Sequence, residues 1–126
     1  MNSPTKILLL ISNLLFTSTL HSGQARIEKV ESECDSQRIC KFSVTISHAD
    51  EGWSHFANGW KIFTPAGELI GHRALAHPHV NEQPFTRSVR GIKIPPSVDT
   101  VVLRANDSVH GESDRKYVMK LKFETD

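Results

Sequence analysis

The chain has 126 residues, with 15 basic and 14 acidic side chains and a formal net charge of +1 at pH 7. Hydrophobic residues make up 38% of the chain, and its mean hydropathy is −0.31. A balanced charge gives no electrostatic reason to bind nucleic acid or an anionic membrane surface, so we expect neither as a partner.

Residues 1–25 have the pattern of a secretory signal peptide. Lys6 supplies a positive charge, residues 7–20 form an apolar stretch, and small residues stand three and one positions before a cut after Ala25. The stretch is interrupted by polar residues 12 and 13 and is too short to span a bilayer. We therefore predict a signal peptide over residues 1–25, one domain over residues 26–126, no stable membrane insertion after cleavage, and a periplasmic or secreted location.

The two cysteines, Cys34 and Cys40, lie close together in the sequence. In an oxidising compartment a local disulfide is the default for such a pair. A metal-thiolate pair and a redox pair are the alternatives, but five intervening residues fit neither the C-x-x-C motif nor common zinc spacing. We predict a structural disulfide between them.

Alternation of apolar and polar residues dominates the rest of the chain, and no segment has a convincing helical pattern. The clearest half-buried strand carries Cys40, Phe42, Val44 and Ile46 on one face. Turn residues separate segments of this kind, for which we predict strands near residues 26–33, 40–46, 58–63, 68–76, 85–94, 101–105 and 117–123. About seven short strands in roughly 100 residues favour an immunoglobulin-like antiparallel β-sandwich, with a small β-barrel as the alternative.

In an antiparallel chain, successive connections alternate between the two ends of the sandwich. The loops near residues 48–57, 77–84 and 107–115 should therefore meet at one end. These loops carry most of the histidines together with several acidic residues, namely His48, His55, His77, His79, His110, Asp50, Glu82 and Asp107. The sequence thus predicts a cluster of imidazoles and carboxylates at one end of the domain.

This ligand set suits a borderline transition ion, so zinc or copper(II) is the predicted cofactor. We predict His77, His79, His110 and His55 as ligands, because His77 and His79 point the same way in an extended segment. Supporting residues that complete or orient the ligand shell are predicted to be Glu82, Asp107, Asp50 and His48. Oxidised cysteines and a single methionine after residue 25, Met119, argue against a copper(I) carrier.

The same residues allow a different function. The cluster of His, Asp and Glu is also explained as a structural hydrogen-bond network in a metal-free interaction or ligand-binding module. Trp53 and Phe56, which share a loop with His55, are then candidate contacts for an unknown protein, glycan or small ligand. No arrangement of nucleophile and base, and no paired acids, indicates an enzyme, so we predict no catalytic residues.

At residues 77–87 (HPHVNEQPFTR) and 107–111 (DSVHG) the chain resembles an uncharacterised family of small exported bacterial proteins. The resemblance covers most of the domain and implies a shared fold and site without a known activity. The chain is also similar to superoxide reductases, immunoglobulin-like iron proteins with a His-Pro ligand loop and a Cys-x-x-His-Gly ligand loop. His77-Pro78 and His110-Gly111 match these loops, but Asp107 stands at the cysteine position. Because the thiolate is missing, the resemblance does not carry that activity to this chain.

Overall fold

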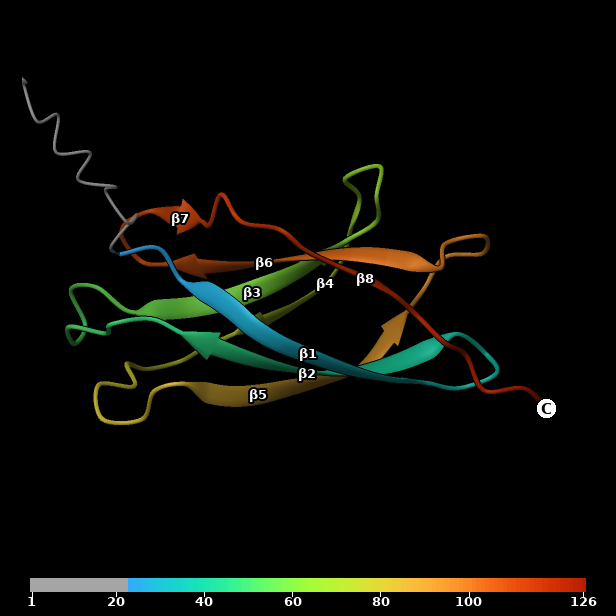
Figure 1. Cartoon of the computed structure of the whole chain (residues 1–126), viewed down its shortest axis with the longest axis horizontal. Helices are drawn as coiled ribbons and strands as arrows, with labels where there is room; N and C mark the ends of the chain where they lie inside the picture. The colour runs from blue at the N-terminus through green and yellow to red at the C-terminus, as the bar shows by residue number, and fades with distance from the viewer. Residues whose placement is uncertain (1–22) are drawn as a thin grey trace, which may run out of the picture.

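The computed structural model describes residues 23–126, which form two antiparallel β-sheets packed face to face (Figure 1). One sheet has the strand order β1-β2-β5, and the other has the order β4-β3-β6-β7, with β8 also paired to β6. The strands are β1 (Arg26–Cys34), β2 (Ile39–Ser47), β3 (Ala57–Phe63), β4 (Leu69–Ala74), β5 (Phe85–Lys93), β6 (Thr100–Asp107), β7 (Gly111–Glu112) and β8 (Tyr117–Lys120). The predicted β-sandwich is confirmed, because the two sheets do not join into the alternative closed barrel within the described residues.

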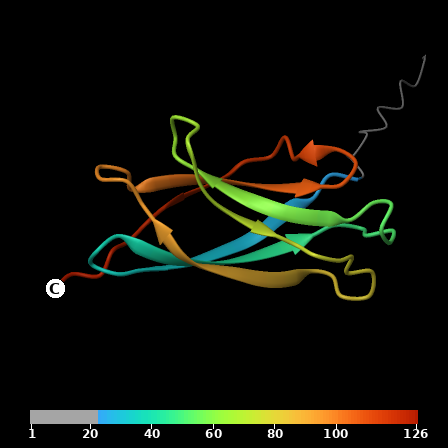
Figure 2. The ribbon, with the colours of Figure 1, turned by 180° about the vertical axis from the view of Figure 1, so that it is seen from behind.

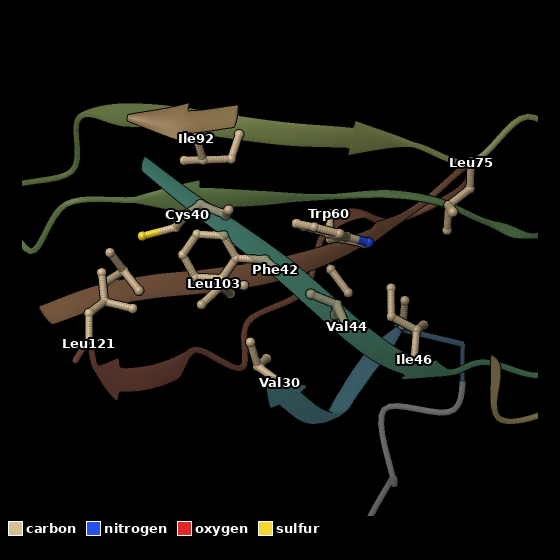
Figure 3. Close-up of a cluster of buried hydrophobic side chains, with 14 of the residues drawn as sticks. Val30, Cys40, Phe42, Val44, Ile46, Trp60, Leu75, Ile92, Leu103 and Leu121 are labelled. Carbon is tan, nitrogen blue, oxygen red and sulfur yellow. The ribbon is translucent and has the colours of Figure 1, made fainter. Parts of the chain in front are cut away.

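The core lies between the sheets and follows the predicted alternation. In β2 every second side chain is buried, which places Phe42, Val44 and Ile46 inside at 0–1% exposure. Trp60 from β3 and Leu103 from β6 meet them from the opposite sheet (Figure 3). Each such side chain contributes about 1.5–3 kcal/mol through removal from water, so this layer is the main source of stability.

Two of the register shifts lie beside glycines in the edge strands β5 and β4. In β5 an extra residue lies beside Gly91, whose φ is +73°, which forms a β-bulge. In β4 the register with β3 shifts beside Gly71. A Cβ on Gly71 would lie 2.7 Å from Ile92 Cδ1, so a larger residue there would require the Ile92 side chain to shift.

The disulfide between Cys34 and Cys40 is present at the turn that joins β1 to β2. Asp35 caps this turn by accepting hydrogen bonds from the backbone N–H groups of Gln37 and Ile39, each at 2.9 Å. Next to it, the Arg38 guanidinium donates to backbone carbonyls of the β5–β6 connection. This end of the sandwich is therefore fixed both covalently and by hydrogen bonds.

The predicted signal peptide lies mostly outside the described residues. Gly23, Gln24 and Ala25 are described, and Ala25 is 1% exposed and belongs to the core. Gln24 contacts the β7–β8 connection, where its side chain bonds Asp114 and Ser113. Among residues 23–126, no helix has the length and hydrophobicity needed to cross a membrane.

Candidate metal centre

Three loops meet at the end of the sandwich opposite the disulfide, as the alternation of connections predicted (Figures 1 and 2). They are the β2–β3 loop, the β4–β5 loop and the β6–β7 turn. The first and third are joined where Ser108 N–H donates to the Phe56 carbonyl at 2.9 Å and Phe56 N–H donates to Ser108 Oγ at 3.0 Å. The first and second are joined through Asp50.

Asp50 is a buried carboxylate that holds two of these loops in place. Its Oδ1 accepts from Ala57 N–H at 3.0 Å and lies 2.5 Å from His48 Nδ1, while its Oδ2 accepts from His79 N–H at 2.7 Å. Burial alone raises the pKa of Asp50, but the two backbone N–H groups and His48 outweigh it, so the pKa lies below its usual value. Asp50 is therefore ionised at neutral pH and orients the His48 ring.

Three side chains form the one group within residues 23–126 that can offer three or more metal ligands together. They are His48, His55 and Asp107, whose ligand atoms all lie within 4.8 Å of one another. His48 Nε2 is 3.2 Å from His55 Nε2, and His55 Nε2 is 3.0 Å from Asp107 Oδ1. His48 follows the end of β2 and Asp107 ends β6, so the two sheets contribute ligands from rigid positions.

Asp107 is held tightly on one side and left unpartnered on the other. Its Oδ1 accepts from the backbone N–H groups of Val109 and His110, at 2.9 and 2.8 Å, and lies 3.0 Å from His110 Nδ1. Its Oδ2 is buried and has no hydrogen-bond partner. Burial raises the pKa of Asp107, but the bonds from His110 and Val109 outweigh it, so the pKa lies below its usual value. The carboxylate is thus ionised with one free, desolvated oxygen.

The second nitrogen of each carboxylate-bound ring is left for other partners. Asp50 lies on His48 Nδ1, so His48 Nε2 is the ring nitrogen directed at the cluster, 2.8 Å from Gly23 O and 3.2 Å from His55 Nε2. Likewise Asp107 lies on His110 Nδ1. Imidazole nitrogens and a carboxylate therefore lie close together in a small volume, and such a donor set can bind a transition metal cation.

The predicted ligands divide into two sets. His55 lies in the group of three, and His110 lies beside it with ring centroids 5.0 Å apart. His77 and His79 lie in the β4–β5 loop with ring centroids 4.6 Å apart, and neither belongs to that group. His48 and Asp107, which the sequence predicted as supporting residues, belong to the group of three.

His79 has its own surroundings, which explain its position. Its ring stacks on Phe85 at a centroid distance of 4.0 Å, and its Nε2 accepts a hydrogen bond from Arg87 Nη2 at 3.1 Å. Burial lowers the pKa of His79, and Arg87 and His77 lower it further, so the ring is neutral at neutral pH. His77 is exposed and bonds its Nδ1 to the Pro78 carbonyl. His79 therefore packs against β5 rather than facing the cluster.

The remaining predicted site residues lie at the surface. Glu82 is 3.4 Å from Arg87 in an exposed ion pair and takes no part in the group of three. Trp53 is 70% exposed and packs edge-on against Phe56, with ring centroids 5.6 Å apart. Both aromatic residues therefore lie on the same loop as His55 without covering the core.

Sequence reasoning did not include Gly23, whose carbonyl oxygen also reaches the cluster. This oxygen lies 2.8 Å from His48 Nε2 and 3.0 Å from His55 Nε2. No motif marks a backbone carbonyl as a ligand, and residue 23 lay within the predicted signal peptide. Only the fold brings it to this place.

Comparisons with known proteins agree with the fold and leave the activity open. No family model matches the chain. A protein of Halomicrobium mukohataei named "Putative lipoprotein" is 36% identical over 103 residues, which are 82% of this chain and 50% of that protein. The chain thus spans about half the length of this relative.

Among solved structures, the superoxide reductase (neelaredoxin) from Ignicoccus hospitalis is similar over 84% of this chain and 87% of its own. The TM-score is 0.51 and the sequence identity is 13%. This similarity shows a shared fold and agrees with the β-sandwich expected from the sequence. At this identity it does not extend to the chemistry of the site.

Proposed function

We propose that this chain is an exported protein that binds a divalent transition metal ion, zinc or copper(II), at His48, His55 and Asp107. The observation that carries the proposal is the buried, unpartnered Oδ2 of Asp107. A desolvated carboxylate oxygen without a donor costs about 1–3 kcal/mol or more, and a cation at this position would remove that cost. Two imidazole Nε2 atoms within reach of the same carboxylate supply the other ligands.

The surroundings of the three ligands support metal binding over a bare hydrogen-bond network. Asp50 on His48 Nδ1 forms the carboxylate–imidazole pairing that fixes the tautomer and ring orientation of a metal-bound histidine. Two nitrogen ligands and one oxygen ligand favour zinc or copper(II) over calcium or magnesium, which prefer oxygen ligands alone. Export is supported by the Cys34–Cys40 disulfide and by the name of the Halomicrobium relative.

The test measures the metal content of the protein by inductively coupled plasma mass spectrometry. The protein is purified without a histidine tag and reconstituted with zinc or copper(II). We expect close to one ion per chain, lost in His48→Ala and in Asp107→Ala. His72→Ala is the matched control, because His72 is an exposed histidine on β4. His77→Ala should keep its ion if the ligands are those proposed here, and should lose it if His77 is a ligand, as predicted from the sequence. Wild-type protein that holds no ion, or a His48→Ala variant that holds as much as wild type, would contradict the proposal.

We propose partner docking as a second candidate function, on the strength of Trp53. A tryptophan that is 70% exposed on a loop beside Phe56 is a typical anchor for a protein or glycan partner. Such binding would depend on Trp53 and would persist in the presence of a chelator, whereas metal binding would show the opposite pattern.

A further inference from the structure

The backbone carbonyl of Gly23 lies where a fourth ligand of the proposed centre belongs. Zinc binds nitrogen and oxygen at about 2.0–2.2 Å, so two ligand atoms that subtend about 90–109° at the ion lie about 2.8–3.6 Å apart. The observed separations between neighbouring atoms of the cluster are 2.8 Å from Gly23 O to His48 Nε2, 3.0 Å from Gly23 O to His55 Nε2 and 3.2 Å between the two Nε2 atoms. These three distances match edges of a coordination shell.

More polar atoms meet at this point than single hydrogen bonds can join. A peptide carbonyl only accepts, and Gly23 O lies 2.8 Å from His48 Nε2, on a ring whose Nδ1 lies 2.5 Å from Asp50 Oδ1. His55 Nε2 has at most one proton, for which Gly23 O, Asp107 Oδ1 and His48 Nε2 all compete. A cation among these atoms would satisfy all of them at once.

The local chain is built to bring this carbonyl in. Gly23 has φ +125°, a conformation that favours glycine, and a Cβ there would lie 2.6 Å from His110 Cε1 and 3.2 Å from His55 Cε1. The next residues hold it: the Gln24 side-chain oxygen accepts from Asp114 N–H at 3.1 Å, and Ala25 is buried in the core. A larger residue would keep this backbone conformation only under strain and would require the His110 ring to move.

We propose that the peptide oxygen of Gly23 is the fourth ligand of the metal centre, so that the ion ties the segment before β1 to the loops at this end. This inference rests on the proposed function. It also requires the exported chain to retain Gly23, which places the cleavage site before Gly23 rather than after Ala25. An exported protein whose first residue is Arg26 would overturn it.

The carbonyl can be observed directly, because the sequence contains a single Gly-Gln pair, Gly23-Gln24. Carbonyl-¹³C glycine combined with amide-¹⁵N glutamine therefore gives one crosspeak in a spectrum that correlates each amide with the preceding carbonyl. We expect the ¹³C shift of Gly23 to move on addition of one equivalent of Zn²⁺. In a second sample labelled with ring-¹⁵N histidine, the signals of His48 and His55 should move as well.

Substitutions give an independent readout by competition with a zinc-binding dye. Gly23→Ala should weaken zinc binding by at least about tenfold, the loss expected when even an outer partner of a metal ligand is removed. Gly67→Ala is the matched control, because Gly67 has φ +91° but no atom within 4 Å of an added Cβ. Adding His110→Ala to Gly23→Ala removes the 2.6 Å contact and should restore part of the affinity.

The outcomes separate the two proposals. Shifts of both the Gly23 carbonyl and the two rings support the fourth ligand. Ring shifts with an unchanged Gly23 carbonyl, or wild-type affinity in Gly23→Ala, overturn it and leave the three-ligand centre standing. An absence of any shift with zinc or with copper(II) overturns the centre itself.

Discussion

Asp50 offers the sharpest test of how the loops at this end are held, through the substitution Asp50→Ala. The side chain is fully buried, and the change removes the acceptor of two backbone N–H groups, on Ala57 and His79, and of the His48 ring. Each buried donor left without a partner costs about 1–3 kcal/mol. With three donors affected, we expect the free energy of unfolding to fall by about 4 kcal/mol, a large part of the stability of a small domain.

Asp35 provides the matched control for this experiment. It also accepts two backbone N–H bonds, from Gln37 and Ile39, but it is exposed, so water replaces it when it is removed. Asp35→Ala should cost about 1 kcal/mol. The assay is equilibrium unfolding in urea without metal, followed by the fluorescence of buried Trp60. If Asp50→Ala costs no more than Asp35→Ala, the reasoning from burial and unsatisfied donors is refuted.

Three further expectations follow from other parts of the molecule. The pKa of His79 is lowered in the fold, so below about pH 6.5 the unfolded chain binds more protons than the folded chain and the free energy of unfolding should fall as the pH drops. The slope of the free energy of unfolding against pH should decrease in His79→Leu but not in His72→Leu. Replacing both cysteines with serine should lower the free energy of unfolding by about 2.4 kcal/mol, because the disulfide closes a short loop in the unfolded chain; an unchanged urea midpoint would contradict this. Trp53→Ala should change stability by less than about 0.5 kcal/mol, since the side chain is 70% exposed; a larger loss in urea unfolding would mean that Trp53 supports the fold.

The fold could be predicted well because its signals are local. Alternation in β2 and the turn residues between strands were enough to assign a sandwich and much of its core. The strand β7 was not predicted, because two residues carry no periodic pattern and its pairing with β6 is set by the turn at residues 108–110.

The candidate site could be predicted only in part, because its location follows from topology, whereas the side chains that come together there are set by packing. The antiparallel order of strands placed the histidine loops at one end, and the structure agrees. The sequence spacing of the histidines does not show which imidazole rings face one another. The extended segment that carries His77 and His79 favoured these two residues as ligands. In the structure, stacking on Phe85 and the hydrogen bond from Arg87 turn His79 toward β5. Residue 23 reaches the site only through the tertiary fold.

Because of the disulfide and the Arg38 contacts, the two ends of this domain should differ in how readily they unfold locally. At one end a covalent bond and the Arg38 guanidinium, which also lies over the Phe123 ring, resist separation of the chain segments. At the other end, the loops are joined by hydrogen bonds and an ionised carboxylate, with no covalent link. Amide hydrogen exchange should accordingly be fastest at the histidine end and slowest in β2 and β3. An ion could then enter or leave through local opening of one end, while the sandwich stays folded around its core.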